Sequence, residues 1–140
     1  MRRPLTDDES LAWWRAARAG KKPTVYDEPQ AGWYRRRLVK DGPWCSVRIW
    51  LHQPIDSETG ELCEDAYFCC DVDGRPADPE QHWLFCCTQP IAETEYIYMM
   101  KLSKYAKARA PREPLANPRK PIDLLNVPPP AFKPKRRRRL

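Results

Sequence analysis

Four carboxylates lie close together in the middle of the chain, at Asp71, Asp73, Asp78 and Glu80. Carboxylate oxygens hold Mg²⁺ in enzymes that act on phosphates, so the cluster makes a metal-dependent nuclease one candidate activity. The spacing differs from that of a Ca²⁺-binding loop, because Gly74 comes too early and no glutamate closes the loop. Asp78 is also the expected N-cap of a helix, which would occupy its side chain.

Other residues that could do chemistry lack a known catalytic spacing. The chain has two histidines, His52 and His82, and contains neither a glycine-rich phosphate loop nor a nucleophile motif. We therefore expect a non-enzymatic protein with no catalytic residues, no bound metal and no cofactor. A nuclease that uses Asp71 and Asp73 is the enzymatic alternative.

The six cysteines, at positions 45, 63, 69, 70, 86 and 87, form no Cys-x-x-Cys pair. Adjacent cysteines in a strand point to opposite faces and do not easily share one ion. A composite zinc site of Cys63, Cys69, His82 and Cys86 is the alternative that this spacing leaves. We predict reduced thiols that pack as small buried apolar side chains, a prediction that an oxidising compartment would reverse.

Charge is unevenly distributed along the 140 residues, whose formal net charge is +6. The final stretch, KPKRRRRL, carries six positive charges, so residues 1–132 are neutral, with 19 basic and 19 acidic side chains. Residues 1–40 sum to +5 and residues 56–80 to −8. The sequence therefore describes a dipolar body followed by a cationic tail. The acidic stretch includes Asp56, Glu58, Glu61, Glu64 and Asp65.

The elements that must position these residues indicate an α+β fold. Alternation of apolar and polar residues predicts a hairpin of strands at 33–39 and 45–52, joined by a four-residue connection over 40–43. A third strand is predicted at 66–72. We expect a small antiparallel sheet with two or three helices and an extended, Pro-rich C-terminal arm.

Two of the helices are indicated by their capping residues. Thr6 and Glu9 form the Ser/Thr-x-x-Glu capping box of a short first helix, which is too short to be stable unless it docks through Trp14. Asp78 as N-cap and Pro79 at the first helical position predict the next helix.

A longer helix is predicted from about Ile91 to Arg109, before the chain becomes rich in proline. Its apolar stripe consists of Ile91, Tyr98, Leu102 and Tyr105. We expect a single compact domain over residues 1–110, an extended arm over 111–132 and a basic tail over 133–140.

The predicted hairpin carries arginines and tryptophans on one face. In the register that we predict, Arg35 lies opposite Arg48. Trp33 then lies opposite Trp50. Like charges directly opposite destabilise a strand pair by up to about 1 kcal/mol unless something neutralises them. This surface, called the basic-aromatic patch below, consists of Trp33, Arg35, Arg37, Arg48 and Trp50.

A nucleic acid would neutralise the basic-aromatic patch. Phosphates attract arginine, and tryptophans beside arginines are typical of single-strand stacking platforms, so single strands are the favoured ligand. The nine acids of residues 56–80 are the alternative source of negative charge. The opposite face of the hairpin, with Val47 and Ile49, is predicted to face the core, with Arg36 as its misfit.

The basic tail is a second candidate contact with nucleic acid. Such a run cannot fold alone and attracts polyanions electrostatically, although a merely solubilising tail would have the same composition. The residues concerned are Lys135, Arg136, Arg137, Arg138 and Arg139.

Three stretches, GWYRRRLVKDGPWCSVRIW, VDGRPADP and PLANPRKPIDL, resemble a group of small uncharacterised proteins in phages and prophages of alphaproteobacteria. The resemblance covers about residues 32–132. It implies a compact accessory protein of a mobile element, in the cytoplasm of the host cell or in the virion. It implies no particular activity and no functional residues, and in a virion the thiols would cross-link outside the cell.

We therefore expect a non-enzymatic accessory protein that binds nucleic acid through the basic-aromatic patch and the tail. The alternative is a protein-binding module, either an inhibitor of a host factor or a structural component of the virion. In that case the acidic 56–80 region would contact the partner protein. No stretch of the sequence is long and apolar enough to span a membrane.

Overall fold

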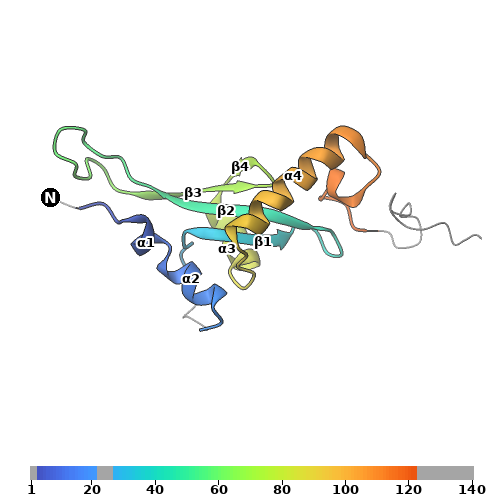
Figure 1. The fold of residues 1–140 in the computed structure, drawn as a ribbon, viewed down its shortest axis with the longest axis horizontal. Helices are drawn as coiled ribbons and strands as arrows, with labels where there is room; N and C mark the ends of the chain where they lie inside the picture. Colours follow the sequence, from blue (N-terminus) through green and yellow to red (C-terminus); the bar gives the residue numbers. More distant parts are fainter. Residues whose placement is uncertain (1–2, 22–26, 123–140) are drawn as a thin grey trace, which may run out of the picture.

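A four-stranded antiparallel sheet organises the chain in the computed structural model, which describes residues 3–21 and 27–122. Each strand pairs with the next one in the sequence, so the sheet is a simple meander (Figure 1). The strands are β1 (Gly32–Arg37), β2 (Trp44–His52), β3 (Tyr67–Val72) and β4 (Arg75–Ala77). The predicted α+β class with a small antiparallel sheet is confirmed.

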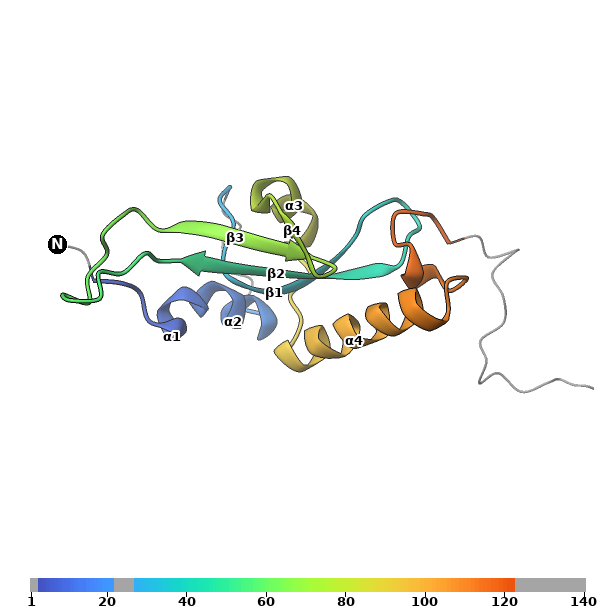
Figure 2. The ribbon, with the colours of Figure 1, turned by 90° about the horizontal axis from the view of Figure 1, so that it is seen from above.

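Helices cover both faces of this sheet. Helix α3 (Pro79–Cys86) lies on one face and α4 (Glu93–Arg109) crosses the other, as Figure 2 shows from above. We call these the α3 face and the α4 face. The N-terminal segment forms α1 (Asp7–Ser10) and α2 (Ala12–Arg18). Within the described residues, no helix is long and apolar enough to cross a membrane.

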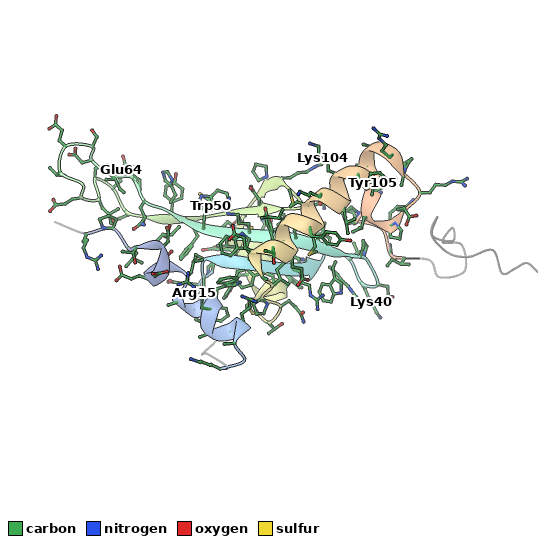
Figure 3. All side chains as sticks on the ribbon, viewed as in Figure 1. Arg15, Lys40, Trp50, Glu64, Lys104 and Tyr105 are labelled. Carbon is green, nitrogen blue, oxygen red and sulfur yellow. The ribbon has the colours of Figure 1, made fainter. Side chains whose placement is uncertain are left out.

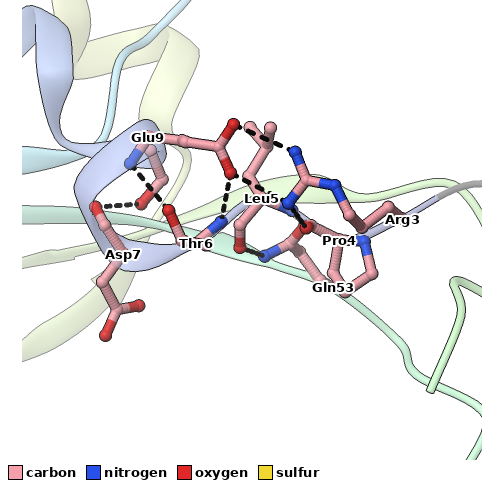
Figure 4. Close-up of polar contacts among 8 residues, drawn as sticks. Arg3, Pro4, Leu5, Thr6, Asp7, Glu9 and Gln53 are labelled. Carbon is pink, nitrogen blue, oxygen red and sulfur yellow. Dashed lines mark hydrogen bonds and ion pairs between the residues drawn. The ribbon is translucent and has the colours of Figure 1, made fainter.

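The predicted capping box begins α1. The Glu9 amide donates to Thr6 Oγ1 at 3.1 Å, and the Thr6 amide donates to Glu9 Oε1 at 3.0 Å (Figure 4). The Arg3 guanidinium binds the same carboxylate and, with the Thr6 amide, lowers the pKa of Glu9 to about 2. Gln53, just beyond β2, forms two hydrogen bonds with the Leu5 backbone and so ties this helix to the sheet.

Three aromatic rings form the centre of the core on the α3 face. Tyr34 of β1 meets Trp83 of α3 edge-on, with 5.5 Å between ring centroids, and Trp13 of α2 lies 5.1 Å from Trp83. Tyr34 is 0% exposed and Trp83 is 1% exposed. Because edge-to-face pairs contribute about 0.5–1.5 kcal/mol beyond burial, this cluster holds α2, α3 and the sheet together.

Arg36 lies on the α3 face, as predicted, and its burial is explained by its partners. Its side chain stacks on the Phe85 ring at 4.2 Å and donates to the Arg37 carbonyl at 3.0 Å and to His82 Nδ1 at 3.0 Å. Because a guanidinium only donates, Nδ1 accepts and His82 is neutral. Burial and the charge of Arg36 lower the pKa of His82.

The predicted hairpin register is wrong by two residues. Arg35 lies opposite Ser46, not Arg48, and Arg48 lies opposite Trp33. The connection is longer than predicted, because β1 ends at Arg37 and residues 38–43 join it to β2. A shift of two residues keeps every side chain on its face, so the predicted division of the hairpin into a core face and a basic face still holds.

The sequence interpretation did not include β4. Asp73 and Gly74 both have positive φ, at 53° and 80°, which fits a two-residue hairpin turn of type I′ between β3 and β4. The Asp-Gly dipeptide was the signal for this hairpin.

The outer edge of β1 guides the chain from one face of the sheet to the other. The Arg35 amide donates to the Gln89 carbonyl and the Ile91 amide donates to the Trp33 carbonyl, so residues 89–91 run along β1 as a short extra strand. The Trp14 indole nitrogen donates to the Trp33 and Ile91 carbonyls at 2.8 and 3.1 Å. This junction sets the place where α4 begins.

The predicted apolar stripe of α4 is only partly turned inward. Ile91, which precedes the helix, is buried and Leu102 is half-buried, whereas Tyr98 and Tyr105 are 62% and 61% exposed. The fully buried residues of the helix are Ser103 and Ala106. Asp73 fastens the helix, since its carboxylate accepts hydrogen bonds from the Ser103 hydroxyl and the Lys107 ammonium.

Residues 111–122 of the predicted arm lie along the body. A short 3₁₀ helix, η1 (Pro114–Ala116), packs against α4, and the Ile122 amide donates to the Asp41 carbonyl at 2.7 Å. The remainder of the predicted arm and the predicted tail lie outside the described residues.

Gly32 tests the junction at β1. A Cβ at this position would lie 2.4 Å from the Trp14 ring, whereas a Cβ at Gly60 would meet nothing within 4 Å. We predict that Gly32→Ala lowers the free energy of unfolding by about 2 kcal/mol or more, through steric displacement of Trp14. Gly60→Ala should lower the free energy of unfolding by only roughly 1 kcal/mol, the cost of placing alanine in a left-handed backbone conformation. Equal losses in urea unfolding would contradict this account.

His82 should make stability depend on pH. Because its pKa is lowered on folding, the unfolded chain binds more protons below the ordinary histidine pKa of about 6.5. The free energy of unfolding should therefore fall as the pH is lowered from about 7 to about 5. In His82→Asn, whose Oδ1 can replace Nδ1 as the acceptor but does not titrate, that fall should be smaller. An identical pH dependence in both proteins would contradict the proposed hydrogen bond.

Candidate nucleic-acid interface

All five residues of the basic-aromatic patch lie on the α4 face of the sheet. They do so because they alternate along β1 and β2 with residues that face the core. Arg37 and Arg48 are exposed, and Trp33, Arg35 and Trp50 are half-buried.

Trp44 belongs to the same surface, although the sequence interpretation left it out. The guanidinium carbons of Arg35 and Arg37 lie 4.2 and 4.6 Å from the centroid of the Trp44 ring. Arg35 Nε also donates to Gln89 Oε1 at 3.2 Å. The alternation that places Arg48 and Trp50 on this face includes Trp44 as well, so the signal was present. We call Arg35, Arg37 and Trp44 the Trp44 cluster.

Arg48 and Trp50 form a second group, the Trp50 cluster. The guanidinium carbon of Arg48 lies 5.0 Å from the centroid of the Trp50 ring. Asp71 of β3 is the neighbour of Arg48 across the strands, but the two form no ion pair. Tyr96 of α4 lies near both. Burial and the charge of Asp71 raise the pKa of Tyr96, and the charge of Arg48 opposes that rise.

Helix α4 lies across the middle of the patch and separates the Trp44 cluster from the Trp50 cluster. Ser46 lies between Trp44 and Arg48 on β2, and its hydroxyl donates to Met100 Sδ of α4 at 3.0 Å. Ser46 is 2% exposed. Trp33 packs edge-on against Trp14 at 4.9 Å and is therefore part of the junction at β1.

The stacked arginines change what this surface offers a ligand. Arg35 and Arg37 already lie over the Trp44 ring, which leaves less of that ring for a nucleobase. Stacking also holds a guanidinium in a limited set of orientations, and its N–H groups match the oxygens of a phosphate in pairs. The clusters are therefore better suited to phosphate contacts than to base stacking.

Charge is separated along the length of the molecule. The β2–β3 connection, residues 53–66, has five acidic side chains and no lysine or arginine. Residues 101–122 have seven lysines and arginines and one acid. Figure 3 shows Glu64 at one end of the molecule and Lys40, Lys104 and Tyr105 toward the other. The acids of the connection therefore do not neutralise the Trp44 cluster.

The end of the molecule that contains Lys40 and residues 101–122 is called the basic end below. It also contains the last described residue before the predicted tail. Ile122, the last described residue, is bonded to the β1–β2 turn at Asp41. The tail residues predicted to bind nucleic acid lie outside the described residues: Lys135, Arg136, Arg137, Arg138 and Arg139.

The residues of the predicted acidic surface lie in a projecting ribbon formed by the ends of β2 and β3 and their connection (Figure 1). We call it the acidic ribbon. The turn is ordered by its own backbone, because the Asp56 amide donates to the Glu61 carbonyl and the Gly60 amide donates to the Asp56 carbonyl. Ile55 and Leu62 form an antiparallel β-bridge at the base of this turn. Of the predicted acidic residues, Glu58, Glu64 and Asp65 are exposed here, and Asp56 and Glu61 are half-buried.

The carboxylates of the candidate nuclease site have separate structural roles. Asp73 binds Lys107 and Ser103, Asp78 caps α3 by accepting from the Glu80 amide, and Asp71 lies on the α4 face. Over residues 3–21 and 27–122, no three or more His, Cys, Asp or Glu side chains are grouped as metal ligands. The composite site with Cys69 and His82 is not assembled, since β3 directs Cys69 to the α4 face while His82 lies beside Arg36.

The cysteines are free thiols, and four of the six are buried. Burial raises the pKa of Cys45 to about 11 and that of Cys70 to about 12, with smaller contributions from nearby carboxylates. Burial likewise raises the pKa of Cys86. Protonated, enclosed thiols are poor nucleophiles and metal ligands, so these side chains act as apolar core residues. Cys63, in contrast, is exposed.

In comparisons with known proteins, the chain matches no protein-family model, no curated protein and no solved structure. The resemblance to phage and prophage proteins therefore stays a prediction.

Thiol accessibility provides a direct check on this arrangement. In the native chain at about pH 7, we predict that a maleimide modifies Cys63 much faster than Cys45, Cys70 or Cys86, because only Cys63 is exposed. Peptide mass spectrometry before and after unfolding would measure this, with Cys63→Ser as the control. Rapid native modification of Cys45 or Cys70 would contradict their burial.

Proposed function

We propose that this chain is a non-enzymatic accessory protein that binds nucleic acid through its α4 face and its basic end. One observation carries the proposal. The three guanidiniums of Arg35, Arg37 and Arg48 share one face of the sheet, stack on tryptophans, and form no ion pair with any described carboxylate. Positive charge that forms no direct ion pair is available to an external anion.

The proposed contacts are to phosphates. A guanidinium that is already held against an indole ring loses less conformational freedom when it binds an anion than a free arginine does. Charge-assisted, paired hydrogen bonds to phosphate oxygens are also among the stronger ones available to a protein. Contacts of this kind carry little information about base sequence and weaken steeply with salt.

The separation of charge would orient the molecule on its ligand. The basic end and the proposed tail contacts would face the phosphates, and the acidic ribbon would point away from them, because like charges repel. Long-range attraction by the basic end and tail would raise the association rate at low salt.

A protein-binding module is the second candidate function, and one observation favours it. The acidic ribbon projects beyond the helices and ends in an ordered turn that presents carboxylates to solvent. Such a surface would suit a basic partner, as an inhibitor of a host factor or as a contact within a virion. In that case Asp56, Glu58, Glu61, Glu64 and Asp65 would make the contacts.

Charge removal on the α4 face tests the first proposal. We predict that Arg35→Gln together with Arg48→Gln, in the full chain, weakens binding of labelled oligonucleotides to a similar extent for different sequences. The slope of log affinity against log salt should fall by about 0.7 for each single-strand phosphate contact that is lost. Fluorescence anisotropy across a salt series measures both quantities, for a single strand and for a duplex.

The matched control is Arg3→Gln together with Arg15→Gln, which removes the same charge from residues that pair with Glu9 and Asp8 near α1. This control should keep most of the affinity. A third variant replaces residues 135–139 with serine. Binding that is lost only in the tail variant, or lost equally in the control, would contradict a site on the α4 face. Absence of binding in every form would favour the acidic ribbon and a protein partner.

A further inference from the structure

The outer side of α4 is aromatic although it faces solvent. Tyr98 and Tyr105 are about three-fifths exposed, at 62% and 61%, and Ile97 is 44% exposed. The buried positions of the same helix are Ser103, at 6%, and Ala106, at 4%. An amphipathic helix normally buries its large apolar residues, so Tyr98, Tyr105 and Ile97 form an exposed, largely aromatic surface that the described chain leaves uncovered.

Lysines interleave with these tyrosines. Lys101 and Lys104 lie between them in the sequence, are exposed, and form no ion pair with a described carboxylate. Tyr105 follows Tyr98 by seven positions, which places the two rings on one side of the helix and about 10 Å apart along its axis. Two lysines between two tyrosines are the combination expected of a surface that contacts both bases and phosphates.

A groove, called the Tyr98 groove below, connects this surface to the Trp44 cluster. It has a volume of about 430 Å³ and runs between α4, the hairpin and the returning arm. Glu95 is the one acidic residue that lines it, and a carboxylate can accept a hydrogen bond from an N–H group of a base. The other lining residues are Arg35, Trp44, Tyr98, Met99, Leu102 and Leu115.

The groove has the character of a site for a flat, partly polar group. Its volume falls within the usual range for small-molecule sites, and apolar side chains make up most of its lining. Arginines that could hold a phosphate lie at its edge, in the Trp44 cluster. A base that entered the groove would contact Tyr98, whose ring is largely free, whereas the Trp44 ring is already covered by arginine.

We propose that the outer side of α4 is a base-stacking surface for single-stranded nucleic acid, with Tyr98 and Tyr105 as the stacking residues and the Tyr98 groove as a site for one base. This inference rests on the proposed function and adds the side chains that contact the bases. It assigns phosphates to Lys101, Lys104 and the Trp44 cluster. A second copy of the chain is the weaker occupant, because two lysine-bearing faces would repel each other.

The test uses the full chain and two labelled probes, a twelve-nucleotide thymidine strand and an abasic strand with the same number of phosphates. Stacking of one base on an aromatic side chain accounts for about a five-fold to hundred-fold change in affinity when that side chain becomes alanine. We expect the native chain to prefer the thymidine strand by at least that lower factor. Tyr98→Ala together with Tyr105→Ala should abolish the preference and leave abasic binding almost unchanged.

Two variants control for indirect effects. Tyr98→Phe together with Tyr105→Phe keeps both rings and should keep the preference for thymidine. Phe85→Ala removes an aromatic ring of the same exposure, 62%, from α3 on the other face of the sheet, and should also keep it. Circular dichroism of each variant reports its folding, and light scattering reports its association state.

The outcomes separate this inference from the proposed function. Equal, salt-dependent binding of both probes by the native chain would overturn the base-stacking surface and leave the phosphate-binding function standing. A preference that survives the double alanine variant would also overturn it, because the bases would then stack elsewhere. A native dimer that the same variant converts to a monomer would identify a second copy as the occupant. Absence of binding to either probe would overturn both proposals.

Discussion

The fold depends on a single indole group that joins three distant segments. Trp14 of α2 donates one N–H to the carbonyls of Trp33 and Ile91, and its ring occupies the space that a side chain at position 32 would fill. This contact seals the edge of β1, fixes residues 89–91 along that edge, and so determines where the chain passes from the α3 face to the α4 face. The position of α4, and with it the division of the basic-aromatic patch, follows from this junction.

The candidate interface reflects a compromise between packing and charge. β1 must supply Tyr34 and Arg36 to the core, and strand alternation then places Arg35 and Arg37 on the opposite face. The protein stabilises these arginines by stacking them on Trp44 instead of pairing them with acids. Five of the 19 acids lie in the ribbon at the other end of the molecule. Stability and an uncompensated basic surface are compatible because cation–π contacts, unlike ion pairs, leave the guanidinium charge unneutralised.

Local signals in the sequence predicted local structure well. The capping box at Thr6, the N-cap at Asp78 and the faces of β1 and β2 follow from short-range chemistry, and all are present. Predicting the register would have required the length of the β1–β2 connection. This connection is hydrogen-bonded to the arm through Asp41 and Ile122, and no local sequence pattern reveals such a contact. The stripe on α4 was partly misassigned because tyrosine is equally typical of cores and of binding surfaces. The stacking of arginine on Trp44 depends on side-chain geometry, which alternation alone does not specify.

The most direct measurement is a titration of the ¹⁵N-labelled full chain with a short single strand at low salt, followed by amide and indole resonances. The account predicts shifts in β1 and the start of β2, in the indole of Trp44 and along α4 from Ile97 to Tyr105. The indole of Trp83, which lies in the core on the α3 face, should not move. Shifts confined to residues 56–65, or no shifts among the described residues, would contradict a nucleic-acid interface on the α4 face.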